Sequence, residues 1–327
     1  MSKQATPQGD IVKEYLRKYP SAASHKLAAI IFTEVPALFK TTELARTAIR
    51  YYRGANGDKK RGNLTAETYI PKVTIPQAEP ENFESYILGD DAYPLIVGGD
   101  AHIPYHDQDA LEIFIERAIE LDAKTILLAG DWIDCYQVSR FQKDPRKRSI
   151  KEELETFKDI IGIIKSALPK AKIIFQKGNH EDRIDAYIMS NAPALFGIDN
   201  LTLNGLLDAK NLGIEIVGNK RIIKAGHLHI VHGHEFGMSV FSPVNPARGL
   251  YMRAKKSALC FHHHRSSSHA ETAINGDKVI TWSGGCLCGL HPEYLPINNW
   301  GHGFTEVAMD DGMFSVRNRD IINYRLV

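Results

Sequence analysis

The apolar residues in the first part of the chain are spaced as they are in helices. They recur every three or four positions in three short segments, which predicts helices over residues 11–19, 23–32 and 42–53. Asp10 is a candidate N-cap of the first helix, and Pro20 follows its end. This part of the chain therefore predicts a small helical domain.

The third predicted helix is basic. Its arginines lie four and three residues apart and so share one face: Arg46, Arg50 and Arg53. Residues 1–62 contain 7 lysines and 5 arginines against 5 acidic residues, a net charge of +7, although the whole chain carries only +1. Three short helices of this kind resemble a helix-turn-helix unit, which predicts contact with DNA or RNA. The alternative is a helical appendage with solvated arginines.

Residues 63–93 show no sustained helical or strand pattern. Prolines interrupt any long element in this segment: Pro71, Pro76 and Pro80. We therefore place a linker over residues 63–93, between the basic helical domain (residues 1–62) and a larger domain (residues 94–327).

In the larger domain, strand and helix patterns alternate. Three short runs are continuously apolar, as in strands buried on both faces: residues 95–97, 125–128 and 173–175. Helical patterns follow the first two runs, over residues 107–121 and 149–167. After residue 212 the period shifts toward two, which predicts a second, more antiparallel sheet. The expected fold is α/β, with two packed mixed β-sheets flanked by helices and a small N-terminal helical domain.

Composition narrows the class of protein. Of the 327 residues, 43% are hydrophobic and 24% are charged, which is ordinary for a globular protein. No apolar run approaches the roughly 20 residues of a membrane span, and the first ten residues lack a signal-peptide pattern. Four cysteines are too few for a disulfide scaffold, so we expect reduced thiols and a cytoplasmic protein. Cys286 and Cys288 form a C-x-C pair, for which structural burial is a simpler interpretation than metal binding.

Polar clusters follow the predicted strands, at the edge where α/β sheets bind ligands. In chain order they are Asp100-x-His102, Gly130-Asp131-x-x-Asp134, Gly178-Asn179-His180-Glu181, His232-Gly233-His234 and His262-x-His264. Carboxylate, imidazole and amide oxygen together suit borderline divalent metals, with Mn favoured and Fe or Zn as alternatives.

The residue types and spacings predict a centre with two metal ions. Asp100 and His102 lie two apart at a strand end and can reach one ion, and Asp131 is the natural anion to bridge to a second. We expect Asn179 to bind metal and His180 to face the substrate. Two ions roughly 3.5–4 Å apart can clamp the attacking and departing oxygens of an in-line displacement at phosphorus.

Together and in this order, the clusters resemble the calcineurin-like metallophosphoesterase superfamily of bacterial and phage type. Its pattern is D-x-H, G-D-x-x-D, G-N-H-[DE], a lone H and G-H-x-H, and the match covers roughly residues 94–265. The resemblance implies a metallophosphoesterase sandwich that hydrolyses a phosphoester with two metal ions.

The resemblance also implies roles for individual residues. The first metal ion would be held by Asp100, His102 and His264, and the second by Asn179, His232 and His262. Asp131 would bridge the two ions, His180 would be the catalytic acid, and Asp134 would orient it. Arg183 and Arg265 are candidates for binding the substrate phosphate, with ordinary surface arginines as the alternative.

The last motif departs from the family pattern, because Phe261 stands where the family has glycine. The segment Gly226–His229 matches the G-H-x-H pattern literally. Nothing between Glu181 and Gly226 supplies the lone histidine that the pattern requires first, so we assign the motif to His262 and His264.

The expected activity is hydrolysis of a phosphomonoester or phosphodiester, and the basic N-terminal domain favours a nucleic acid or nucleotide substrate. One alternative is a protein or small-molecule phosphatase whose N-terminal domain binds a partner. A non-catalytic DNA-binding protein is a further alternative, which the presence of His180 and of every expected ligand type disfavours.

Overall fold

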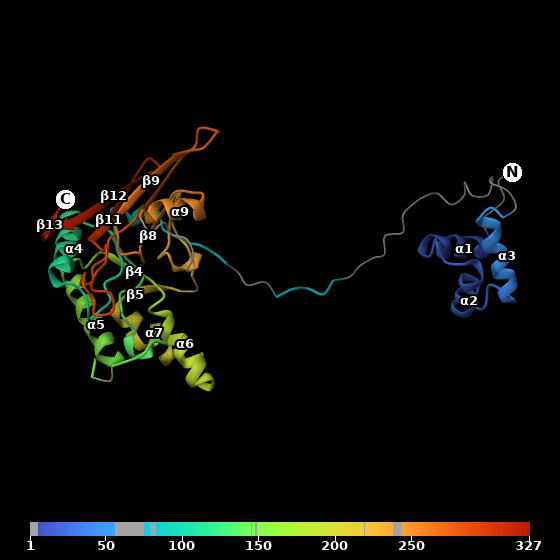
Figure 1. Cartoon of the computed structure of the whole chain (residues 1–327), viewed down its shortest axis with the longest axis horizontal. Helices are drawn as coiled ribbons and strands as arrows, with labels where there is room; N and C mark the ends of the chain where they lie inside the picture. Colours follow the sequence, from blue (N-terminus) through green and yellow to red (C-terminus); the bar gives the residue numbers. More distant parts are fainter. Residues whose placement is uncertain are drawn as a thin grey trace. The chain divides into compact units, whose positions relative to one another are not determined.

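The computed structural model describes residues 6–55, 75–79, 83–144, 146–147, 149–218, 220–237 and 244–327 (Figure 1). The chain divides into two compact units, residues 1–80 and 81–327. Residues 56–74, which include part of the predicted linker, lie outside the described residues. Strand β1 (Tyr86–Ile87) falls within the segment predicted as linker, but it pairs with a sheet of the larger unit.

The N-terminal unit contains three helices: α1 (Pro7–Lys18), α2 (Ser24–Glu34) and α3 (Thr42–Tyr52). The first helix begins earlier than predicted, and its N-cap is Thr6 rather than Asp10, since the Thr6 hydroxyl accepts a hydrogen bond from Gly9 N. Pro7 fits the first helical turn because that turn leaves its N–H groups without helical partners. The apolar faces of the helices form one buried core: Val12, Leu16, Leu27, Ile31 and Ile49.

One of the three arginines predicted to share a face of α3 turns toward a neighbouring helix instead. The Arg53 side chain donates hydrogen bonds to Ser24 Oγ, at 3.0 Å, and to the Ala22 carbonyl, so it holds the start of α2. Arg46 pairs with Glu43 at 3.3 Å on the same helix. Arg50 is exposed. Helical spacing identified a shared face, but it could not reveal that Arg53 turns toward a neighbouring helix.

A seven-stranded sheet forms the centre of the larger unit, in the order β13-β12-β11-β2-β3-β4-β5. Four strands are parallel: β2 (Leu95–Gly98), β3 (Thr125–Ala129), β4 (Lys172–Gln176) and β5 (Ile214–Val217). Three antiparallel strands extend it: β11 (His302–Asp310), β12 (Met313–Ile322) and β13 (Arg325–Leu326). The helices that follow β2 and β3 are α4 (Gln108–Glu120) and α5 (Ile150–Ala167), and their buried residues share a core with the sheet.

A second sheet packs on the other face of the first, in the order β1-β6-β7-β8-β10-β9. Its remaining strands are β6 (Ile223–Ala225), β7 (Leu228–Ile230), β8 (Ala258–Cys260), β9 (Ser267–Thr272) and β10 (Lys278–Ser283). Helix α9 (Pro246–Ala254) shares a further small apolar cluster with β8. Three shorter helices connect β4 to β5: α6 (Asp182–Asn191), α7 (Leu203–Leu207) and α8 (Ala209–Leu212).

The predicted fold class is confirmed, with one correction to the sheets. The second sheet is mixed, as expected, but it is not more antiparallel than the first, since β1–β6, β7–β8 and β8–β10 pair in parallel. Segments 214–217 and 304–307 follow the shift of period at residue 212, but they belong to β5 and β11 of the first sheet. A period of two identifies a strand but does not specify its partner, which depends on hydrogen bonds between distant segments.

Burial on both faces explains the continuously apolar central strands. In β2, Leu95 and Val97 face the core between the sheets, whereas Ile96 faces helices α4 and α5. No helix in the described part of the chain is long and apolar enough to cross a membrane. The carboxyl ends of β2, β3 and β4 meet at one edge, where the polar clusters lie.

Candidate metal centre

The loops after the central strands bring the polar clusters together through an unusual backbone conformation. Five of the predicted metal ligands have a left-handed backbone, with φ between 49° and 69°: Asp100, His102, Asp131, His262 and His264. Each such residue costs roughly 1–2 kcal/mol relative to ordinary backbone. Backbone strain of this kind is typical of functional sites, because the surrounding structure must hold it in place.

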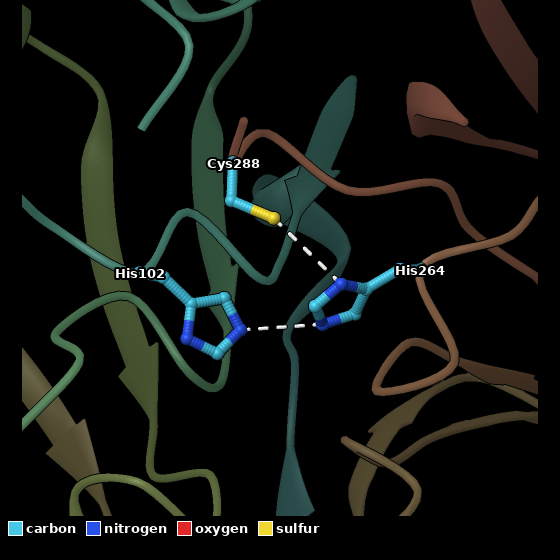
Figure 2. Close-up of side chains that lie close together, drawn as sticks. All are labelled: His102, His264 and Cys288. Atoms are coloured by element: carbon cyan, nitrogen blue, oxygen red, sulfur yellow. Dashed lines mark hydrogen bonds between the residues drawn. The ribbon is translucent and has the colours of Figure 1, made fainter. Parts of the chain in front are cut away.

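One group of side chains brings together Asp100, His102 and His264. The two imidazole Nε2 atoms lie 3.2 Å apart, and Asp100 Oδ1 lies 3.4 Å from His264 Nε2 and 4.0 Å from His102 Nε2. Figure 2 shows one ring nitrogen of His264 directed toward His102 and the other toward Cys288. These three residues are the set predicted for the first metal ion.

A second group lies beside the first. His232 Nε2 is 3.2 Å from Asp131 Oδ2 and 3.2 Å from His262 Nδ1. The other nitrogen of His232 lies 2.8 Å from the Ala129 carbonyl, and donation of its proton there leaves Nε2 as the free donor atom. His232 Nε2 is also 3.9 Å from Asp100 Oδ1, so the two groups adjoin.

The donor atoms of these groups fit divalent cations. Ligand atoms lie within 4.8 Å of one another in three sets: His102, His264 and Cys288; His102, Asp131 and His180; and Asp131, His232 and His262. Their nitrogen and carboxylate donors suit Mn, Fe or Zn. The side-chain oxygen of Asn179 is buried and has no hydrogen-bond partner among the described residues. An unpaired buried carbonyl oxygen costs about 1–3 kcal/mol, and a metal ion would remove that cost.

Two glycines of the motifs allow this close approach. A Cβ on Gly178 would overlap the Asp131 carboxylate, and a Cβ on Gly130, whose φ is +84°, would overlap the His232 ring. The glycine of each motif is therefore explained by the side chain that packs against it.

Glu181 is a structural member of the site that the sequence did not assign. Its fully buried carboxylate accepts hydrogen bonds from the backbone N–H groups of Asp131, Ile133 and Gly178, at 3.0, 2.9 and 2.7 Å. It thereby ties the loop after β3 to the loop after β4. Its motif position was visible in the sequence, but its contacts depend on the folded loops.

His180 lies between a carboxylate and a guanidinium. Its Nδ1 is 2.8 Å from the Asp134 carbonyl and 3.1 Å from Asp134 Oδ1, while Arg183 Nη2 is 2.6 Å from its Nε2. Burial acts against the charged imidazole, but the carboxylates of Asp131 and Asp134 outweigh it and raise the pKa of His180. Burial also acts against the Asp134 carboxylate, yet hydrogen bonds from His102 and His180 hold the pKa of Asp134 well below its usual range.

The remaining candidates separate clearly in space. His234 faces Asp182, at 3.6 Å, rather than the carboxylates of the cluster. His229 lies on β7 with its Nδ1 3.2 Å from the Ser257 carbonyl, so the literal G-H-x-H segment is part of a sheet. Arg183 lines the cavity beside Asn179 and His262. The Arg265 carbonyl accepts a hydrogen bond from Ser283 Oγ in the second sheet.

Cys288 contacts the site directly, in addition to being buried. All four cysteines are buried, and none of them forms a disulfide. The Cys288 sulfur lies 3.7 Å from His264 Nδ1, and ligand atoms of His102, His264 and Cys288 all lie within 4.8 Å of one another (Figure 2). Cys288 therefore contacts a candidate ligand, which its position far along the sequence could not indicate.

The glycine missing from the last motif is replaced by a packed aromatic ring. Phe261 is fully buried, and its ring occupies the space that a Cβ on Gly99 or on Gly284 would need. A Cβ on Gly99 would lie 2.8 Å from Phe261 Cγ, and one on Gly284 would overlap the ring more deeply. Two glycines elsewhere in the chain thus accommodate the side chain that precedes His262.

Gly284→Ala is expected to displace the Phe261 ring and, with it, His262. Overpacking of this kind costs about 1–3 kcal/mol, so the melting temperature should fall by roughly 5 °C, with weaker metal binding. Thermal unfolding with and without Mn²⁺ measures both effects. The matched control is Gly301→Ala, since nothing lies within 4 Å of its added Cβ. Equal melting temperatures for the two variants would show that Phe261 does not hold His262 in place.

The chain matches one family of known proteins and is similar to several solved structures. Residues 93–282 match the model of the family described as calcineurin-like phosphoesterase. None of the curated protein sequences matches the chain. Vps29 from Entamoeba histolytica complexed with zinc is 15% identical, with a TM-score of 0.38 over 71% of this chain and 95% of that one. The Pseudomonas putida nuclease MPE is 12% identical, with a TM-score of 0.30 over 68% and 87% of the two chains. A dimetal phosphatase from Danio rerio is 12% identical, with a TM-score of 0.37 over 71% and 97%.

Proposed function

This chain belongs to the calcineurin-like phosphoesterase family, and from that premise we propose that it hydrolyses a phosphomonoester or phosphodiester with two divalent metal ions. The family makes it a metal-dependent phosphoesterase. The observation that carries the two-metal proposal is the pair of adjoining donor groups, one around Asp100 and one around Asp131.

The chain's donor set supports a division between two ions. Asp100, His102 and His264 would hold the first, whereas Asn179, His232 and His262 would hold the second, with Asp131 shared between them. When bound, the ions supply a hydroxide nucleophile near neutral pH and offset the charge that develops on the phosphate. The mixture of oxygen and nitrogen donors favours Mn, with Fe or Zn as alternatives.

Two side chains beside the donor groups would act on the substrate, and a third would position one of them. Arg183 would bind a phosphate oxygen through its guanidinium, which at present contacts His180 and the Asp134 carbonyl. Protonated His180 would give its proton to the departing oxygen. Asp134 would hold the imidazole by its Nδ1 and favour its charged form.

A panel of substrates tests this proposal. Metal-depleted full-length protein should hydrolyse neither p-nitrophenyl phosphate nor bis(p-nitrophenyl) phosphate, and added Mn²⁺ should restore cleavage of at least one. The preferred ester decides between monoesterase and diesterase activity. Failure of Mn²⁺, Fe²⁺ and Zn²⁺ alike to support cleavage of either ester would exclude the proposal and favour a non-catalytic protein.

We also propose that the basic N-terminal unit contacts nucleic acid, with binding of a protein partner as the alternative. Support comes from its net charge of +7 over residues 1–62 and from the exposed Arg50 on α3. The test is a mobility shift of duplex DNA by the full chain and by an Arg46→Ala/Arg50→Ala variant. The full chain should shift the DNA in a salt-sensitive way and the variant less so. No salt-sensitive shift by the full chain would contradict this proposal and leave the protein-partner alternative.

A further inference from the structure

Three cavities lie beside the donor groups and His180, and neighbouring cavities share lining residues. The first, about 680 Å³, is lined by Asn179 and His262, and the second, about 780 Å³, by Asp134 and His180. The third, about 390 Å³, is lined by His102, Cys288 and Trp300 among others. The first and second share Ser139, Phe141 and Arg183, whereas the second and third share Asp134, Tyr136, Lys147, Glu293 and Tyr294. The three therefore form one cleft that extends to both sides of His180.

Exposed aromatic side chains line both limbs of this cleft. Phe141 is 61% exposed and Tyr187 is 41% exposed in the limb beside Asn179, and Tyr294 is 75% exposed in the opposite limb. Phe141 offers no hydrogen-bonding group, so its exposed ring can contribute only apolar or stacking contacts. Large exposed aromatic rings gathered along a cleft indicate a binding surface.

The limb beside Asn179 is also basic. Arg140, Lys143 and Arg183 line it, and no carboxylate is among the described residues that do so. Lys143 Nζ lies 5.7 Å from the centre of the Tyr187 ring, and the Arg140 guanidinium lies 5.4 Å from that of Phe141. Cations alternate with stacking surfaces, as in proteins that bind single-stranded nucleic acid.

In the opposite limb, the positive charge is largely compensated. Lys147 pairs with Glu293 at 2.8 Å, and Tyr294 and Trp300 contribute rings 6.3 Å apart. This limb is therefore suited to hold bases more than phosphates. The Trp300 ring lies 4.0 Å from that of His264, so even a small ester at the donor groups would lie close to this limb. A polymer with nucleotides on both sides of one phosphate would in addition reach Phe141 and Tyr187 in the other limb.

We propose that the cleft binds single-stranded nucleic acid, with bases stacked on Phe141 and Tyr187 on one side of the scissile phosphate and on Tyr294 on the other. This proposal rests on the phosphoesterase activity proposed above. Duplex DNA is excluded because its bases are already stacked on each other and cannot reach the rings. The reaction consumes one water, which loses a proton as its oxygen forms the new P–O bond. The bond to one sugar oxygen breaks, that oxygen takes a proton from His180, and His180 regains a proton from the solvent. A terminal phosphate and a hydroxyl result.

The test compares three substrates with Mn²⁺ and the full-length protein: a fluorescein-labelled single-stranded oligodeoxynucleotide, its duplex, and bis(p-nitrophenyl) phosphate. The wild type should cleave the single strand at least about tenfold faster than the duplex. Phe141→Ala, Tyr187→Ala and Tyr294→Ala should each lower the ratio of kcat/KM for the single strand to that for the small ester about tenfold, the loss of one stacked base.

The matched control is Tyr324→Ala, an exposed tyrosine on the turn before β13, 55% exposed, which should leave this ratio unchanged. The basic N-terminal unit is the same in every variant, so its binding cannot produce a difference between them. If the wild type cleaves the small ester but all three variants keep its ratio of kcat/KM for the single strand to that for the small ester, only the cleft proposal is overturned. A wild type that cleaves the small ester but not the single strand would overturn it as well. Loss of all ester hydrolysis in the wild type would instead contradict the phosphoesterase proposal.

Discussion

His180→Ala is expected to lower kcat by about a hundred- to ten-thousandfold while leaving metal content unchanged. The reason is the position of the ring: its Nε2 lies 3.8 Å from Asp131 Oδ2, at the margin of the donor groups, and its Nδ1 is engaged by Asp134. In the proposed mechanism it passes a proton, and neither proposed set of ligands includes it. Steady-state kinetics together with elemental analysis of the purified variant measures both parts.

The pH dependence sharpens this prediction. Asp131 and Asp134 raise the pKa of His180, and a catalytic acid must be protonated, so kcat should fall as pH rises through that raised pKa. His180→Ala should lose this alkaline limb. The matched control is His227→Ala, an exposed histidine of the G-H-x-H segment before β7. A His180→Ala enzyme that retains wild-type kcat, or that loses its metal ions, would contradict the assigned role.

Asp131→Asn is expected to reduce activity roughly a thousandfold and to lower the number of bound metal ions per chain. Asn retains the Oδ1 acceptor, which receives the hydrogen bond from His180 N at 2.8 Å, so the loop should remain folded. It removes the negative charge that lies 3.2 Å from His232 Nε2 and that would hold two cations close together.

A second aspartate provides a close control. Asp122 has a φ of 48°, close to the 52° of Asp131, but its side chain is exposed and pairs with Lys124. Asn tolerates this backbone conformation, so Asp122→Asn should preserve structure, metal content and rate. If Asp131→Asn retains full metal content and activity, Asp131 does not bridge two ions.

The sequence predicted the local features of this molecule well. Continuous apolar runs such as Leu95–Val97 identified the central strands because burial on both faces removes the need for polar residues. The polar clusters followed directly, because residues at the ends of neighbouring parallel strands must meet at one edge of the sheet. The α/β fold and the family could therefore be predicted from short segments alone.

Features that depend on distant contacts could not be predicted in this way. The membership of β5 and β11 in the first sheet is decided by pairing with β4 and β2, not by periodicity. Glu181 reaches the backbone of a different loop, and Cys288 touches His264 from a segment 24 residues further along. Arg53 satisfied the helical spacing of a basic face but is used to hold the neighbouring helix. In each case the role of the residue depends on which residue it contacts in the folded chain, and its type and position in the sequence do not reveal that contact.

The central claim is that two metal ions are held by the donor groups around Asp100 and Asp131. Anomalous diffraction from crystals of the full chain grown with Mn²⁺ tests it most directly. The expected result is two anomalous peaks about 3.5–4 Å apart, with the Asp131 carboxylate between them and Asn179 beside one of them. A single peak, or peaks away from these residues, would contradict the two-metal centre.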